Sequence, residues 1–165
     1  MVKKDGGLFH NYVNGQSKIN GYLEDYAMVI QASLDLYEIT LNQLWIERAL
    51  KLSEYVINNF SSSESELFYF TSKKDEDLIS RSVEFRDNVI PSSNSIMAKN
   101  LFRLYHYFDK EEYYERSKNM SLSVTQEFEA YPSGYSNWFD LIYNLKSNYY
   151  AVSYTHLTLP TSYPV

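Results

Sequence analysis

Three carboxylate side chains stand at the starts of predicted helices. Glu24 and Asp25 open the first helical segment, and Asp87 precedes the most apolar one. Two carboxylates that face one ligand can serve as general acid and general base on a sugar or a related polyol. Glu24, Asp25 and Asp87 are therefore the candidate catalytic residues. A structural role is the alternative, because acidic groups in a first helical turn offset the helix dipole by about 0.3–1 kcal/mol each.

Amide and aromatic side chains near the same helix starts could complete such a site. Asn94 offers hydrogen bonds to ligand hydroxyls, and Tyr135 and Trp138 offer ring faces for the C–H surface of a carbohydrate. Asn94 also suits a helix cap, which is worth about 1 kcal/mol. These three residues are candidate ligand-binding residues, with capping and core packing as the alternatives.

Two arginines lie in the polar segment ahead of Asp87. Arg86 is a candidate ligand-binding residue, since it could neutralise an anionic substrate, and Arg81 could do the same. Both arginines could instead form ion pairs with Glu84 and Asp87. We favour the ion pairs.

The composition excludes several kinds of function. The chain has no cysteine, so it holds no disulfide and no thiolate, and redox chemistry cannot reside in this segment. His10 and His106 lack the spacing of a metal site, so neither a metal nor another cofactor is expected. The net charge of −6 argues against a nucleic-acid partner. No run of about 18 apolar residues and no signal peptide occurs, which predicts a cytoplasmic protein without a membrane partner.

Helical periodicity defines the elements that must position these side chains. Helices are expected over residues 22–40, 45–60, 94–108, 111–129 and from 136 onward, with tight breaks at 41–43 and 109–110. The first and third are apolar on most sides, so we expect the first to be buried nearly all round, whereas the second and fourth are amphipathic. Buried and exposed helices in alternation indicate helical hairpins around a common centre, which predicts an all-α fold of the α/α toroid type.

The connection between the second and third helices is unusually long, at residues 61–93. Residues 67–70 and 78–83 are apolar enough for two short strands, so a β-hairpin is expected over one mouth of the toroid. Successive helices of a hairpin stack are antiparallel. The first, third and fifth helices therefore begin at the same mouth, which gathers all the candidate site residues there.

Residues 152–165 have neither helical nor alternating periodicity. Their sequence, read back into codons, resembles a transposon-end adapter used in library preparation. We therefore predict a non-native, adapter-derived tail and exclude its His156 from functional arguments.

Several ordered motifs resemble those of YyaL-type thioredoxin-domain proteins, which include the spermatogenesis-associated thioredoxin-like proteins of animals. The motifs are GYLEDYA at 21–27, LDLYE at 34–38, IPSSNS at 90–95 and NLFRL at 100–104. The resemblance covers about residues 8–146, with Asp87-Asn88-Val89 where Asp-Gly-Ala is usual and Ser93 where glycine is common. A non-glycine at Ser93 weakens any requirement for a left-handed backbone there.

The resemblance implies a six-hairpin toroid similar to those of N-acylglucosamine 2-epimerases and six-hairpin glycosidases. Residues 1–151 would then form an incomplete (α/α)6 toroid domain, and a thioredoxin-like domain would lie upstream in the full-length protein. One expected function is binding or processing of a small carbohydrate or polyol at the mouth. The alternative is a non-catalytic module that binds a partner or supports the redox domain. Fold analogy alone does not decide between them.

Overall fold

The structure is a computed structural model that describes residues 2–75 and 81–147. Its helical elements are α1 (Leu23–Thr40), α2 (Gln43–Phe60), α3 (Ser93–Phe108), α4 (Glu111–Ser123), η1 (Thr125–Glu127), η2 (Pro132–Tyr135) and α5 (Ser136–Lys146). The α-helices begin within a residue or two of the predicted positions. The tail predicted at residues 152–165 lies outside the described residues.

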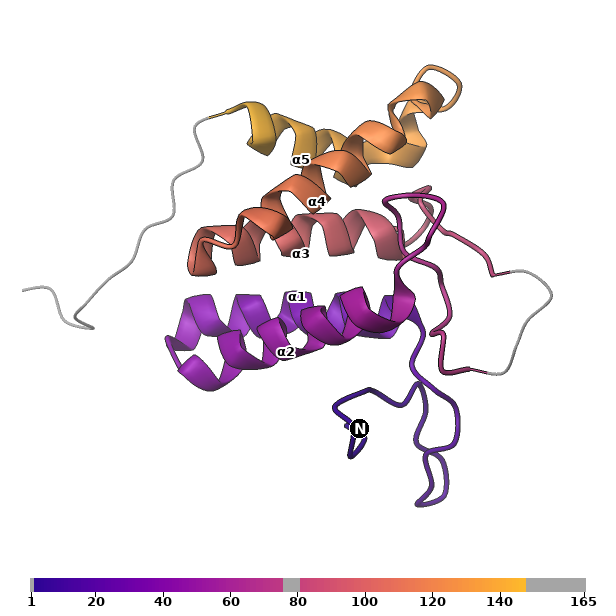
Figure 1. Ribbon diagram of the computed structural model, residues 1–165, viewed down its shortest axis with the longest axis vertical. Coiled ribbons are helices and arrows are strands. Elements are labelled where there is room, and N and C mark those ends of the chain that lie inside the picture. Colours follow the sequence, from indigo (N-terminus) through magenta and orange to yellow (C-terminus); the bar gives the residue numbers. More distant parts are fainter. Residues whose placement is uncertain (1, 76–80, 148–165) are drawn as a thin grey trace, which may run out of the picture.

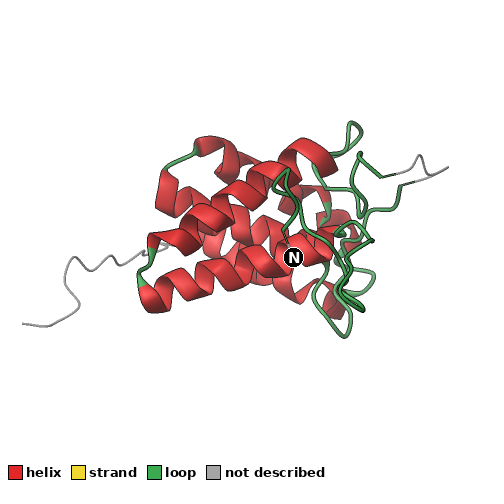
Figure 2. Cartoon of the chain, turned by 90° about the horizontal axis from the view of Figure 1, so that it is seen from below, coloured by secondary structure: helices red, strands yellow, loops and turns green. Residues whose placement is uncertain are grey.

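The helices form antiparallel hairpins that stack on one another. α1 pairs with α2, α3 pairs with α4, and α3 packs on α1 between the two hairpins (Figure 1). Both views show the long loops gathered at one end of the helices, where α1, α3 and α5 begin (Figures 1 and 2). The predicted all-α architecture and the shared mouth are confirmed.

The two hairpin turns repeat the same local geometry. Leu41 and Asp109 each have a left-handed backbone with φ of 53°. Their N–H groups donate to Tyr37 O and Tyr105 O at 2.7 Å, which satisfies carbonyls that the helix end leaves open. Because each turn reverses the chain within a few residues, α2 and α4 must run back along their partners.

Polar contacts fix the spacing of the stacked helices around the apolar core. The Asn100 side chain of α3 donates to Ala27 O of α1 at 2.9 Å, and Ser117 Oγ of α4 donates to Ala98 O of α3 at 2.7 Å. Both alanines are fully buried. Their small side chains allow the backbones to approach closely enough for these bonds.

Three details differ from the sequence predictions, and the first concerns α1. Met28, Leu36 and Ile39 are exposed, so α1 is buried on one face and not nearly all round. The described part of the chain packs α2 and α3 against the other face. The helical period directs Leu36 and Ile39 away from both partners, whereas Met28 lies beside a cavity that Ile96 of α3 also lines.

The second difference is the end of α4, which was predicted to reach residue 129 and ends at Ser123. Hydroxyl groups there compete with the helical pattern: Ser121 Oγ, Ser123 Oγ and Thr125 Oγ1 each donate to the carbonyl three residues earlier. Such side-chain bonds favour tighter turns over the α-helix. The chain accordingly continues as the short 3-10 helix η1.

The third difference is the β-hairpin predicted at 67–70 and 78–83. No strand forms in the described residues of this loop, and residues 76–80 lie outside them. Phe68 makes an isolated bridge with Ser61, and Phe70 N donates to Ser82 O at 2.8 Å. The buried Asn94 side chain occupies the backbone groups of Phe68 that a neighbouring strand would use. The Asn94 side-chain amide therefore makes the backbone hydrogen bonds that a paired strand would otherwise make.

Among the described helices, none is long and apolar enough to cross a membrane.

Candidate functional site

Two cavities lie side by side at the mouth where α1 and α3 begin. The smaller has a volume of about 260 Å³ and the larger about 480 Å³. Glu24, Ile90, Pro91 and Ser93 line both of them, so the cavities adjoin along a shared wall. The remaining wall of the smaller cavity is mainly apolar, with Ala27, Met28, Val29 and Ile96. This pair of cavities is called the mouth site below.

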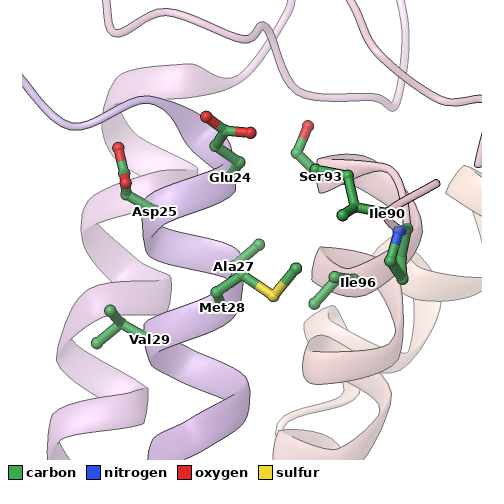
Figure 3. A pocket seen from close by; sticks show the side chains of 9 residues that line it. Glu24, Asp25, Ala27, Met28, Val29, Ile90, Ser93 and Ile96 are labelled. Atoms are coloured by element: carbon green, nitrogen blue, oxygen red, sulfur yellow. The ribbon is translucent and has the colours of Figure 1, made fainter. Parts of the chain in front are cut away.

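Glu24 is the predicted catalytic residue that lines both cavities of the mouth site. Its side chain projects from the first turn of α1 toward the gap between α1 and α3, and Ser93 projects into the same gap from α3 (Figure 3). Glu24 is half-buried. A carboxylate in this position can accept hydrogen bonds from a ligand in either cavity.

Glu84 is a second carboxylate of the mouth site, which the sequence had suggested only as an ion-pair partner. It lines the larger cavity at the exposed rim. Partial loss of water around its carboxyl group and the nearby charge of Glu24 raise the pKa of Glu84. Glu24 is thus close enough for its charge to oppose ionisation of Glu84.

A period of two in the loop before α3 could have revealed Glu84. Val83 and Phe85 pack against the core, so an extended chain directs Glu84 and Arg86 to the opposite side.

The predicted ion pairs of the two arginines are wrong in their partners. Arg86 Nη2 contacts Glu127 Oε2 at 2.6 Å. Arg81 donates to Thr71 O and lies over the Tyr69 ring.

Ser93 contributes a buried hydroxyl to both cavities. Its residue is only 3% exposed, and its Oγ has no hydrogen-bond partner among the described residues. Ser93 has helical backbone geometry and is absent from the positive-φ positions, so a glycine is not required here. A buried hydroxyl that lacks a partner is costly in an empty site, by about 1–3 kcal/mol, and a ligand polar group would relieve this cost.

Asp25 is held by its own helix start and by the N-terminal loop. Its Oδ2 accepts from Tyr22 N at 2.8 Å and lies 2.9 Å from His10 Nδ1. Asp25 also contributes to the wall of the smaller cavity. Its observed contacts are those of a helix cap, which was the structural alternative for this residue.

Asp87 ties together the beginnings of α3 and α5. It is 7% exposed, and its Oδ1 accepts from Ser92 N at 2.9 Å and from Ser95 Oγ at 2.7 Å. Its Oδ2 accepts from Asn137 N at 2.9 Å. Both oxygen atoms are used within the fold, and Asp87 lines neither cavity of the mouth site.

Asn94 lies behind the mouth site and holds the loop in place. It is fully buried, accepts from Phe68 N at 2.8 Å, and donates to Phe68 O at 2.9 Å and to Glu84 O at 2.8 Å. The last bond fixes the backbone that carries the Glu84 carboxylate. Asn94 thereby acts on the site through the loop, while ligand contact by Asn94 stays a prediction.

Tyr135 and Trp138, two of the other predicted ligand-binding residues, form hydrogen bonds with the loop before α3. Trp138 Nε1 donates to Phe85 O at 2.7 Å, and the Tyr135 hydroxyl accepts from Arg86 Nε at 3.0 Å. Trp138 and Tyr135 are fully buried. The structure places both at the predicted end of the fold, and Arg86 lines the larger cavity. A stacking role for the two rings stays a prediction.

The mouth site offers the carboxylates of Glu24, Glu84 and Asp25, the unpartnered hydroxyl of Ser93 and an apolar wall. Within the described residues, no group of three or more His, Asp or Glu side chains is arranged to hold a metal ion. The available chemistry is hydrogen bonding to polar ligand groups, proton transfer through the carboxylates, and contact with an apolar ligand face.

Comparisons with known proteins place the chain by sequence and by fold. No protein-family profile matches it. It is 31% identical over 114 residues to human spermatogenesis-associated protein 20, and the match covers 68% of this chain and 14% of that protein. It is 30% identical over 118 residues to an uncharacterized protein of Caenorhabditis elegans, covering 72% of this chain and 16% of that protein. The chain thus spans about one sixth of the length of these relatives, or less.

A solved structure of a GH76 α-mannanase from Bacteroides thetaiotaomicron resembles the fold, with a TM-score of 0.63 and 16% sequence identity. The match covers 86% of this chain and 40% of the mannanase chain. The fold is therefore that of an α/α toroid, as the alternation of helices predicted, and the sequence is similar to that of spermatogenesis-associated protein 20.

Proposed function

We propose that this chain is part of an α/α toroid domain in a relative of spermatogenesis-associated protein 20, and that its mouth site binds a sugar or another small polyol. The observation that carries the proposal is the convergence of Glu24, Glu84 and Ser93 on two adjoining cavities. Carboxylates and a hydroxyl match the many donors and acceptors of a polyol, and the apolar wall matches its C–H face. The α-mannanase, a neighbour in fold, is named for a sugar polymer.

Processing of the ligand would use the two carboxylates in different roles. Glu84 is the candidate proton donor to a ligand oxygen, because loss of water and the nearby charge of Glu24 raise its pKa above that of an ordinary glutamate. Glu24 would then accept a proton on the other side of the ligand. Asp25 and Asp87, the other predicted catalytic residues, are less suited to this role because their carboxylates already accept backbone N–H groups.

The proposal includes the surroundings of this segment in the full-length protein. Residues 1–151 would form the later hairpins of the toroid domain, with a thioredoxin-like domain upstream and an adapter-derived tail after residue 151. Any dithiol chemistry would reside in the upstream domain, since this chain contains no cysteine.

Titration of the chain with glucose and mannose, followed by saturation-transfer NMR or calorimetry, tests the binding proposal. We expect weak saturable binding that Glu24→Gln and Ser93→Ala reduce several-fold. The matched control is Glu47→Gln, which removes an exposed carboxylate on α2 away from the mouth site. Absence of binding to any sugar, or equal loss in the control, would contradict the proposal.

A non-catalytic partner-binding module is the second candidate. The observation in its favour is an exposed apolar pair at the edge of the mouth, Val89 at 96% and Ile90 at 57% exposure. Such side chains are typical of protein contacts. Val89→Ser with Ile90→Ser should abolish capture of the upstream thioredoxin-like domain if this candidate is correct, and should leave capture unchanged if the mouth serves only a small ligand.

A further inference from the structure

Glu24 and Glu84 carry negative charge that the chain itself does not neutralise. All fifteen lysine and arginine residues lie within the described residues, and none forms an ion pair with either glutamate. A like charge nearby disfavours the ionised form of a carboxyl group, and a cation bound beside both glutamates would offset this effect.

Two positive groups, one in the loop before α3 and one on α3, are committed to other partners. Arg86 lines the larger cavity, but its Nη2 contacts Glu127 at 2.6 Å and its Nε donates to the Tyr135 hydroxyl at 3.0 Å. Lys99 of α3 contacts Asp140 of α5 at 2.6 Å. Because Glu127 offsets the charge of Arg86, no lysine or arginine of the chain neutralises the carboxylates of Glu24 and Glu84.

Ser93 provides the second, independent sign of a ligand. Its hydroxyl is nine-tenths buried or more, lacks a partner among the described residues, and projects into the gap that Glu24 also faces (Figure 3). A ligand with a donor group at this point would satisfy the Ser93 oxygen and a carboxylate together. A protonated amine has three such donors and a positive charge.

The apolar wall indicates the size and the apolar face of the ligand. Met28, Ile90 and Ile96 line the smaller cavity beside Glu24, and its volume of about 260 Å³ suits a small molecule. We propose that the mouth site selects a polyol that carries a free protonated amine, that is, an amino sugar, over the neutral sugar of the same size. This inference rests on the proposed sugar-binding function and adds the charge of the ligand to it.

Calorimetric titration of the 165-residue chain at pH 6.5 and low salt with four probes tests the inference. Glucosamine, N-acetylglucosamine, glucose and glucuronic acid differ in charge but share a ring. We expect glucosamine to bind at least tenfold more tightly than glucose, since charge-assisted hydrogen bonds are roughly twice as strong as neutral ones. N-acetylglucosamine should behave like glucose, glucuronic acid should bind least, and added salt should shrink the preference.

Variants assign the preference to the named side chains. Glu24→Gln and Glu84→Gln should each lower the glucosamine-to-glucose ratio at least threefold, whereas Ser93→Ala should weaken both sugars and Glu47→Gln should change neither. Circular dichroism of each variant checks that it is folded.

Four results would overturn the inference. Equal affinity for glucose and glucosamine would contradict selection by charge and leave the proposed sugar binding intact. Absence of binding by all four sugars would contradict the proposed function as well. Displacement of glucosamine by micromolar calcium chloride would identify a cation site in place of an amine site. Tighter binding of a lysine-containing peptide than of glucosamine would identify a protein partner.

Discussion

Replacement of Asn94 by alanine should be among the most destabilising single changes in this chain. The Asn94 side chain makes three hydrogen bonds, two to the backbone of Phe68 and one to Glu84 O, and both Asn94 and Phe68 are fully buried. Removal leaves Phe68 N–H and C=O without this partner in the core, at about 1–3 kcal/mol for each group. Water can replace the bond to Glu84 O at the exposed rim. The expected loss is about 3–5 kcal/mol, a large part of a typical stability of roughly 5–15 kcal/mol.

Urea unfolding followed by far-UV circular dichroism measures this loss, and two other asparagines provide a graded control. Asn100 makes one interhelical bond, to Ala27 O, so Asn100→Ala should cost about 1–2 kcal/mol. Asn88 is exposed, so Asn88→Ala should cost less than about 0.5 kcal/mol. An Asn94→Ala loss no larger than that of Asn88→Ala would refute the reasoning that a side-chain amide holds the loop to α3.

Three further predictions concern the ionisable groups. Asp87→Ala should lower the unfolding free energy in urea by about 2–4 kcal/mol, because it leaves Ser92 N and Asn137 N, at the starts of α3 and α5, without an acceptor. A loss below about 1 kcal/mol would contradict the structural role of Asp87. The pKa of Glu84 is raised, so the folded state binds more protons than the unfolded state from about pH 4.5 up to the raised pKa, and stability falls as pH rises through this window. Glu84→Gln should therefore gain stability relative to the parent as pH rises from 4 to 7. A stability difference that stays constant with pH would contradict this prediction. Burial lowers the pKa of His106 below 6.5, so the unfolded state binds the proton first and stability falls as pH drops below about 6.5. His106→Gln should reduce the dependence of unfolding free energy on pH between pH 7.5 and pH 5.5. An unchanged pH dependence would exclude His106 as its source.

Much of the architecture follows from local sequence signals. The helix starts coincide with cap residues such as Asn42 and Ser92, whose side chains accept from Leu44 N and Ser95 N. Capping and helical period depend on residues within about one turn, so they can be read along the chain. The alternation of apolar and amphipathic helices then allows few arrangements other than stacked hairpins. The sequence therefore determined the toroid architecture and the end of the fold at which the candidate site residues gather.

The sequence could not determine which carboxylates face the mouth site. Glu24 and Asp25 are neighbours in the chain, but one helical step separates their roles. Glu24 lines both cavities, whereas Asp25 lines only the smaller one and its carboxylate contacts Tyr22 N and His10. Asp87 looked equally catalytic, and only the packing of α5 beside α3 gave its second oxygen a partner, Asn137 N.

Glu84 shows the limit most clearly, because its position depends on contacts between segments far apart in the sequence. Its loop is held by Asn94, which also binds the backbone of Phe68, 26 residues away. The Trp138 ring nitrogen holds the next residue, Phe85, from a separate helix. The period of two gives the side of the loop on which Glu84 lies but not where the loop itself is placed. The tertiary contacts of α3 and α5 therefore decided that Glu84 and not Asp87 lines the same cavity as Glu24.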